Sequence, residues 1–327
     1  MEELTNHAAP SDRRRESARW AAVVLNWNGR EETLRCLRSL RAAGGLELPV
    51  VCVDNGSIDG SVDAIRKAFP EVDLIEAGAN LGYAGGNNLG IRRALEAGAD
   101  WVVLVNNDAM VAADLVEGFE AAVRCRPDAG ILAGKVYRSD RPTTIWFAGQ
   151  SVNLVLGYSG KPRGHNQPDG PRYGVVVDVG RAVGALMAVS RDTLQDVGLL
   201  DETLFAYVED VEFCLRARRR GHAVVFAPGA HAWHSVSAST GGEQTSTHSV
   251  YYGVRNTITV CERTRPLARP LDSLRRLCIV GTFAMYCLRR RHSGPALRAL
   301  VAGYRDARHG RLGIRPSDGQ VRPAARS

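Results

Sequence analysis

The residues of this 327-residue chain that are best suited to chemistry stand at the end of a short apolar run, 101–111 (WVVLVNNDAMV). The run closes on Asn106, Asn107 and Asp108. An apolar strand that delivers a carboxylate at its C-terminal end is how an open α/β sheet offers a ligand to a metal or a phosphate. A divalent cation that bridges phosphates takes oxygen ligands, usually including one or two carboxylates. The segment predicts such a site, although Asn-Asn-Asp is also a normal cap for a following helix.

A second acidic group lies much further along the chain, in 205–220 (FAYVEDVEFCLRARRR). Glu209 and Asp210 stand side by side where a helical pattern begins, a position at which the helix dipole favours carboxylates. The other explanation is catalytic, because a positioned Asp or Glu can remove the proton of an attacking hydroxyl. A histidine usually packs or faces solvent, but His234 could complete a metal site begun by Asp108.

Two turn-rich segments of the first third could bind a nucleotide. Asp54 lies within 51–61 (VCVDNGSIDGS), where a carboxylate between glycine turns can accept hydrogen bonds from a nucleobase or a ribose. An ordinary strand-to-helix turn has the same composition. Asn80 opens 80–89 (NLGYAGGNNL), whose backbone N–H groups could hold a diphosphate at a helix start. A tight turn that needs positive φ is the alternative, and a nicotinamide cofactor is disfavoured because the segment follows the third strand.

Apolar runs and helical patterns alternate over the first third of the chain. We expect buried strands at 21–25, 49–53, 72–75 and 101–105, and helices at 31–40, 61–69 and 84–97. This alternation predicts βαβ units and a parallel sheet. Further along, we expect long loops with one or two short strands over 135–180, strands at 185–189 and 223–226, and helices at 192–197 and 208–220.

The net charge of +7 is distributed unevenly. Residues 255–327 carry sixteen Arg against four acidic residues, a net of +12, so the remainder is about −5. A basic tail suggests an anionic partner. Within it, 277–288 (LCIVGTFAMYCL) is apolar and bracketed by arginines. It is too short to span a bilayer but suits a helix that lies in an anionic membrane surface, with a core helix as the alternative.

Seven cysteines without any Cys-x-x-Cys pair indicate a reducing compartment and no disulfide framework. Zinc is disfavoured for the same reason, since no thiolate pair stands at zinc-binding spacing. The polar residues 1–18 predict a disordered lead-in rather than a signal peptide. We therefore expect a cytoplasmic protein, with peripheral attachment to the inner face of the membrane as an open extension.

A series of segments in this order resembles the family 2 glycosyltransferases, and among them the bacterial rhamnosyltransferase-like enzymes of cell-wall and surface-polysaccharide assembly. The segments are VVLNWNG, VDNGSIDGS, NLGYAGGNN, LVNNDAM, GALMAV, LLDETLFAYVEDVEFCLRARRRG and HAWHSVSAST. The resemblance covers about 20–240 and extends weakly to 251–256 (YYGVRN). It implies a GT-A fold, which is a Rossmann-like α/β fold with a mostly parallel central sheet, over 19–240. Residues 241–327 would form a helical, basic C-terminal region.

The resemblance also implies an inverting transfer from a nucleoside-diphosphate sugar with Mg²⁺ or Mn²⁺. It makes Asp210 the catalytic base with Glu209 beside it, and gives Asp108 and His234 to the metal. It places the nucleotide sugar on six side chains: Asn26, Trp27, Asn28, Asp54, Asn80 and Asn107. The family's acidic motif often begins with Asp, whereas in this chain Asn106 and Asn107 precede Asp108, and fewer negative charges should weaken metal affinity.

The expected partners are a nucleotide-sugar donor and an acceptor hydroxyl. dTDP-rhamnose is the favoured donor, ahead of UDP-linked galactofuranose or N-acetylhexosamine. The acceptor could be a glycan, a polyprenyl-linked glycan or a small molecule. Two rival functions are another nucleotide-dependent enzyme, such as a nucleotidyltransferase, and a nucleic-acid binder. We expect no nucleic-acid partner, because the basic excess is confined to the tail and lacks interleaved aromatic residues.

Overall fold

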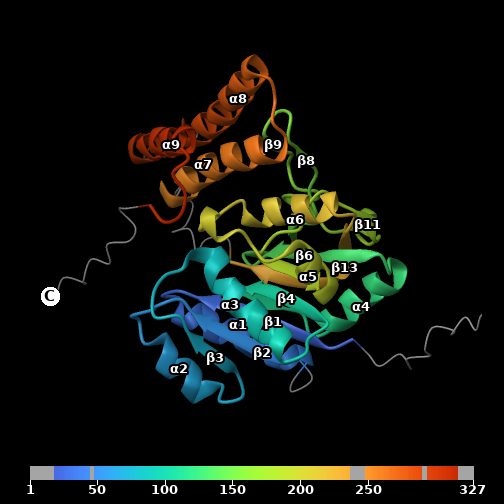
Figure 1. The fold of residues 1–327 in the computed structure, drawn as a ribbon. Coiled ribbons are helices and arrows are strands. Elements are labelled where there is room, and N and C mark those ends of the chain that lie inside the picture. The colour runs from blue at the N-terminus through green and yellow to red at the C-terminus, as the bar shows by residue number, and fades with distance from the viewer. Residues whose placement is uncertain (1–17, 45–47, 236–246, 289–292, 316–327) are drawn as a thin grey trace, which may run out of the picture.

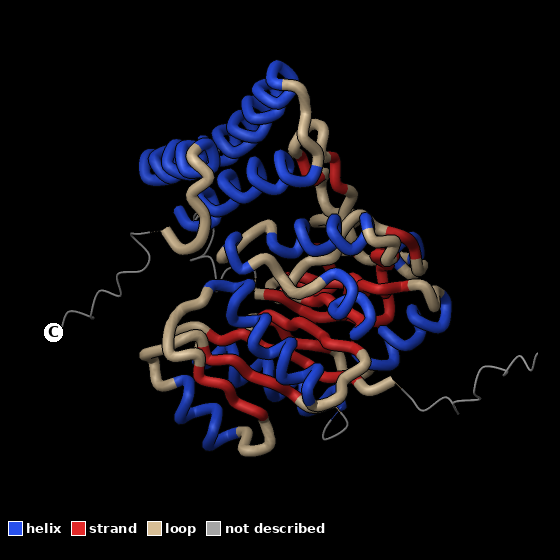
Figure 2. Tube along the Cα trace, viewed as in Figure 1, coloured by secondary structure: helices blue, strands red, loops and turns tan. Residues whose placement is uncertain are grey.

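The computed structural model describes residues 18–44, 48–235, 247–288 and 293–315. Helices lie on both faces of a central sheet, and a group of three helices is stacked on one side of this layer (Figure 1). Figure 2 separates the strands of the sheet from the helices that cover them. Nearly all of the expected lead-in, 1–18, lies outside the described residues.

The first half of the sheet is parallel, as the alternation predicts. Its strands run in the order β3-β2-β1-β4. Their bounds are β1 Trp20–Asn26, β2 Val50–Asp54, β3 Asp73–Glu76 and β4 Trp101–Asn106. The connecting helices are α1 Arg30–Gly44, α2 Ser61–Ala68 and α3 Gly82–Glu96. Strands β1 and β4 are almost wholly buried, which is why their sequences are continuous apolar runs.

The glycines of α3 have a packing role. A Cβ at Gly86 would overlap the Leu25 side chain of β1, and one at Gly90 would overlap Val23. Gly82 has a φ of 75°, which favours glycine at the turn into the helix. The glycine-rich segment 80–89 therefore lets α3 lie directly on β1 and β2.

The second half of the sheet is antiparallel in part, so the whole sheet is mixed. Strand β12 (Leu186–Ser190) pairs antiparallel with both β4 and β6. Further strands are β5 Ala109–Val111, β6 Ala129–Arg138, β7 Arg141–Phe147, β8 Val152–Asn153, β9 Tyr158–Ser159, β10 Gln167–Pro168 and β11 Val177–Asp178. The expectation of one or two short strands over 135–180 was wrong. Most of these strands are two-residue pairings made by tertiary contact, which leave no periodic signal.

The last strand, β13 (Ala223–His234), runs well beyond the predicted end at Phe226. Its pairing with β6 shifts register between Ala227 and His231, and Pro228 lies within this irregular part. Proline is tolerated at such bulges because no ladder hydrogen bond is lost there. After the bulge the strand pairs antiparallel with β5, which sets His234 opposite Ala109.

The remaining helices cover the sheet or form the C-terminal group. They are α4 Leu115–Cys125, α5 Arg191–Val197, α6 Glu209–Arg219, α7 Thr247–Thr264, α8 Arg269–Leu288 and α9 Ser293–Arg308, with 3₁₀ turns at Pro171–Tyr173 and Glu202–Leu204. The C-terminal helices share a core that includes Tyr251, Ile279 and Leu300, and Phe205, from the loop before α6, belongs to it. None of the helices in the described ranges combines the length and the apolarity needed to cross a bilayer.

Candidate active site

A hydrogen-bonded network joins the carboxyl ends of three neighbouring strands. The Asn26 side chain at the end of β1 is fully buried, and its Nδ2 donates to Asp54 Oδ2 at the end of β2 (2.7 Å). Its Oδ1 accepts from Thr33 Oγ1 (2.7 Å). Thr33 Oγ1 in turn accepts from Asn107 Nδ2, just beyond β4 (3.1 Å). The Asn26 amide group makes its hydrogen bonds within the protein. Asn26 therefore fixes the position of Asp54 directly and that of Asn107 through Thr33.

The turn after β2 is also built by Asp54. Its Oδ1 accepts from the N–H groups of Gly56 (3.2 Å) and Ser57 (2.8 Å), and Asp54 is 2% exposed. Asn28 has a φ of 51° and accepts through Oδ1 from the Ile58 N–H (2.9 Å). Trp27, by contrast, is 49% exposed, so its ring is available to a flat partner such as a nucleobase.

Asn80 is linked to a residue that sequence reasoning missed. Asn55 Nδ2 donates to Asn80 Oδ1 (3.0 Å), and Asn55 Oδ1 accepts from the Leu81 N–H (3.0 Å). Asn80 Oδ1 also accepts from the Gly82 N–H (2.9 Å). The pair therefore ties the turn after β2 to the start of α3. The available signal was the position of Asn55 directly after Asp54.

Asp108 and His234, both predicted as metal ligands, lie in contact. His234 Nε2 lies 2.8 Å from Asp108 Oδ1, and both residues are 6% exposed. The pairing of β13 with β5 brings them together, and the Ser235 N–H donates to the Asp108 carbonyl (3.0 Å). Among the described residues, His234 Nδ1 and Asn106 Oδ1 are buried without a hydrogen-bond partner. Such atoms are few in native proteins, and a bound ion or water would satisfy them.

The donor set fits Mg²⁺ or Mn²⁺ in part. Asp108 offers a carboxylate oxygen and His234 an imidazole nitrogen, and these cations accept phosphate oxygens and water as further ligands. Over the described ranges, no group of three or more His, Cys, Asp or Glu could hold a metal ion. A cation at this place would therefore depend on the diphosphate of a bound nucleotide.

Asp210 is tied to the end of β4 through the start of β12. Its Oδ2 accepts from Arg181 Nη1 (3.0 Å) and from the Gly184 N–H (3.3 Å). The next residue, Ala185, accepts through its carbonyl from the Asn106 N–H (3.3 Å). The two acidic segments of the sequence therefore converge on one edge of the sheet.

A partly buried tyrosine, Tyr83, contacts the same junction. The Tyr83 hydroxyl donates to the Gly184 carbonyl (2.9 Å). Burial raises the pKa of Tyr83 well above its usual value, and the negative charges of Glu209, Asp210 and Asp108 raise it further. Gly184 therefore links the Tyr83 hydroxyl, through its carbonyl, to Asp210, through its N–H.

The two adjacent acids of α6, Glu209 and Asp210, have different surroundings. Burial, and then the charge of Asp210, raises the pKa of Glu209 to about 8, while Arg181 opposes this rise. Glu209 Oε2 is buried and has no hydrogen-bond partner among the described residues. Glu209 therefore holds its proton at pH 7, whereas Asp210 Oδ2 forms an ion pair with Arg181 Nη1 at 3.0 Å. Environments that separate two carboxyl groups in this way assign them different roles.

The loop that leads into these acids is strained. Phe205, Tyr207 and Val208 have φ values of 64°, 64° and 74°. Bulky and β-branched residues rarely adopt positive φ, and such strain persists only where the surroundings enforce it. The strained residues directly precede Glu209, so this backbone sets the direction in which the acids point.

A motif in α7 holds the strained loop. Asn256 Nδ2 lies within hydrogen-bonding distance of the carbonyl oxygens of Leu204 (2.9 Å), Ala206 (2.8 Å) and Tyr207 (2.8 Å). Arg255 Nη2 donates to the Leu204 carbonyl as well (3.0 Å). Arg255 and Asn256 are 1% and 0% exposed. The C-terminal region therefore helps to build the site, and the weak resemblance at 251–256 was the signal for it.

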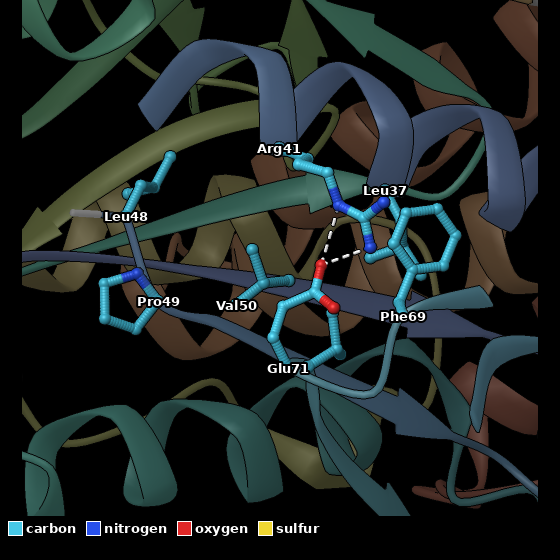
Figure 3. A pocket seen from close by; sticks show the side chains of 8 residues that line it. Leu37, Arg41, Leu48, Pro49, Val50, Phe69 and Glu71 are labelled. Atoms are coloured by element: carbon cyan, nitrogen blue, oxygen red, sulfur yellow. Dashed lines mark hydrogen bonds and ion pairs between the residues drawn. The ribbon is translucent and has the colours of Figure 1, made fainter. Parts of the chain in front are cut away.

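A separate pocket lies at the opposite end of β2 (Figure 3). Its lining includes Leu37, Val50 and Phe69, with Arg41 and Glu71 paired across it (Nε to Oε1, 2.7 Å). The Arg41 guanidinium also stands 4.3 Å from the centre of the Phe69 ring. The pocket contains none of the predicted site residues and is distinct from the carboxylate cluster.

The fold and the site together define a GT-A glycosyltransferase. A mannosyltransferase from Pyrobaculum calidifontis, solved with GDP-Man and Mn²⁺, superposes with a TM-score of 0.54 at 16% identity, over 93% of this chain and 78% of that one. The sequence model of the family described as glycosyltransferase-like family 2 matches residues 18–252. The chain belongs to glycosyltransferase family 2, which confirms the resemblance.

Similar sequences include named rhamnosyltransferases. The N-acetylglucosaminyl-diphospho-decaprenol L-rhamnosyltransferase of Mycobacterium tuberculosis is 31% identical over 241 residues, which are 68% of this chain and 78% of the relative. The dTDP-rhamnosyl transferase RfbF of Shigella flexneri is 26% identical over 250 residues, with 72% and 77% covered.

Replacing Glu209 by Gln tests its protonation. In the unfolded chain this carboxyl ionises near pH 4.3, whereas in the folded protein it holds its proton up to about pH 8. The wild type therefore loses stability as the pH rises between these values, and the Gln variant does not. We expect the melting temperature of Glu209→Gln to rise relative to wild type from about pH 5 to pH 8. The exposed Glu96→Gln on α3 is the control, and parallel curves for wild type and Glu209→Gln would contradict the assignment.

Replacing Asn256 by Ala tests the α7 contact with the loop. The substitution removes the hydrogen bonds of the Asn256 side chain to the loop, so the backbone before Glu209 should become less well fixed. Misplacing a catalytic group by about 1 Å costs on the order of a hundredfold in rate. We expect kcat for sugar transfer to fall by about tenfold to a hundredfold, with little change in the KM of the donor. Thr259→Ala is the control, because that hydroxyl donates to the Arg255 carbonyl within α7. An unchanged kcat for Asn256→Ala would remove this role.

Proposed function

We propose that the protein transfers a deoxyhexose, with L-rhamnose from dTDP-rhamnose favoured, to a hydroxyl of a lipid-linked glycan. The observation that carries the proposal is that the Asp108–His234 pair lies just beyond β4, and that Asp210 is linked to the end of the same strand through Gly184 and Ala185. Glycosyl transfer needs a held diphosphate and a nearby base, and this arrangement would provide residues for both. The names of the two relatives support the sugar and the lipid-linked acceptor.

The proposed reaction is an inverting single displacement. Asp210 takes the proton of the acceptor hydroxyl while the oxygen attacks the anomeric carbon and the nucleoside diphosphate departs from the opposite face. Asp210 is the better base of the two acids because Glu209 already holds its proton at neutral pH. Arg181 Nη1 donates to Asp210 Oδ2 (3.0 Å) and so restrains the position of this carboxylate.

The donor would lie along the carboxyl ends of β2, β1 and β4. Trp27 offers an exposed ring to the base, and the Asn26–Asp54 pair fixes the turns around it. Asp108 and His234 would hold the divalent cation, with Mn²⁺ or Mg²⁺ as candidates. When bound, such a cation neutralises charge that develops on the leaving diphosphate.

The proposal also places the enzyme at the inner face of a membrane. An acceptor carried on a polyprenyl diphosphate remains in the bilayer, so the transferase must work at its surface. The net charge of +12 in residues 255–327 would draw the protein toward anionic lipid.

The donor is tested by hydrolysis of sugar nucleotides, which requires no acceptor. We expect slow release of dTDP from dTDP-rhamnose in the presence of Mn²⁺, and less release from UDP-linked galactofuranose or N-acetylglucosamine. In transfer assays, Asp210→Asn should bind the donor normally and lose about a hundredfold or more in kcat. Asp63→Asn, an exposed acid on α2, is the matched control. Normal turnover by Asp210→Asn, or turnover of nucleoside triphosphates instead of sugar nucleotides, would contradict the proposal.

A further inference from the structure

After its first turn, which exposes Arg269, the helix α8 has its charged side chains inside and many of its apolar side chains outside. Between Leu271 and Leu288 the charged residues are Asp272, Arg275 and Arg276. Asp272 and Arg275 are 8% and 2% exposed, and the Arg276 side chain is 19% exposed. A surface helix normally has the opposite arrangement.

Ion pairs fix this orientation. Arg275 and Arg276 both pair with Asp272, and Arg276 also pairs with Glu262 of α7. Arg275 Nη1 donates to the carbonyl oxygens of Leu154 (3.3 Å) and Arg265 (2.7 Å). These contacts bind the charged side of α8 to the rest of the protein, so the apolar side faces out.

The outer face of α8 is apolar between Leu271 and Leu288. Its large side chains are at least half exposed: Leu271 (56%), Leu274 (56%), Leu277 (67%), Met285 (50%) and Leu288 (62%). The other exposed positions of this stretch are uncharged: Ser273, Gly281, Thr282 and Tyr286. A helix of 20 residues is about 30 Å long, and a continuous apolar strip of that length marks a binding surface.

The charges around this face favour an anionic partner. In the described part of the C-terminal region, the acidic residues Glu262, Asp272 and Asp306 all take part in ion pairs with arginines. The neighbouring helix α9 exposes three further arginines: Arg298, Arg305 and Arg308. A second copy of the chain would bring like charges together, whereas an anionic lipid surface brings opposite charges.

We propose that the outer face of α8 inserts into the boundary between headgroups and acyl chains of an anionic bilayer. The breadth of the apolar face suits a helix lying in the plane of the interface. In Figure 1, α8 and α9 lie on the side of α7 that is away from the sheet. Since α7 holds the loop before Glu209, docking would set the active site one helix layer, about 10 Å, from the membrane.

The purpose of this membrane docking rests on the proposed function, but docking can be tested without measuring sugar transfer. The full-length protein is sedimented with vesicles of phosphatidylcholine, with and without phosphatidylglycerol. We expect binding to the anionic vesicles, and about a tenfold or greater loss of partitioning for Leu277→Glu, because a buried Leu is worth more than one decade of affinity. Val175→Glu is the matched control, since Val175 is 56% exposed outside the helical group.

Three results would overturn the inference: no vesicle binding by the wild type, equal binding to neutral and anionic vesicles, or unchanged binding by Leu277→Glu. A dimer in solution that Leu277→Glu dissociates would assign the face to a second copy instead. Donor hydrolysis by Leu277→Glu should equal that of the wild type. If no sugar nucleotide is hydrolysed while vesicle binding behaves as expected, the proposed function fails and the membrane face stands.

Discussion

The site depends on the short connection between the end of β4 and the start of α6. Gly184 donates its N–H to Asp210, and the next carbonyl, that of Ala185, accepts from Asn106. Two consecutive residues just before β12 thus join the strand that Asp108 follows to the helix that contains Asp210. The antiparallel insertion of β12 beside β4 makes this junction possible, because it turns the start of β12 toward the carboxyl end of β4.

The C-terminal helices also help to position the residues of the site. The positive φ values at Phe205, Tyr207 and Val208 are unfavourable, and the buried Arg255 and Asn256 hold the carbonyl groups of this loop. The helix that stabilises the loop is also the one on which α8 packs. The helical group that presents the apolar outer face therefore also holds the loop before Asp210, the proposed base, although the predicted domain boundary falls near 240.

Prediction from the sequence succeeded where the signal was local. Strands β1, β2 and β4 are almost wholly buried, so their apolar runs marked them directly, whereas the edge strand β3 is partly exposed. The strand-end residues Asn26, Asp54 and Asn107 are joined by hydrogen bonds through Asp54 Oδ2 and Thr33 Oγ1. The prediction that Asp108, His234 and Asp210 belong to one site came from the family resemblance and not from the periodicity of the sequence. Arg181 and Asn55 were missed because their roles arise from contacts across the fold. The extension of β13 past Pro228 was missed because a proline normally ends a strand.

The central claim is that Asp108 and Asp210 serve one crevice. A crystal structure of the protein with Mn²⁺ and a non-hydrolysable dTDP-rhamnose analogue tests it most directly. We expect the cation to be bound by Asp108, His234 and the diphosphate, with the anomeric carbon on the side of the Asp210 carboxylate. A cation on other residues, or a sugar that points away from Asp210, would contradict it.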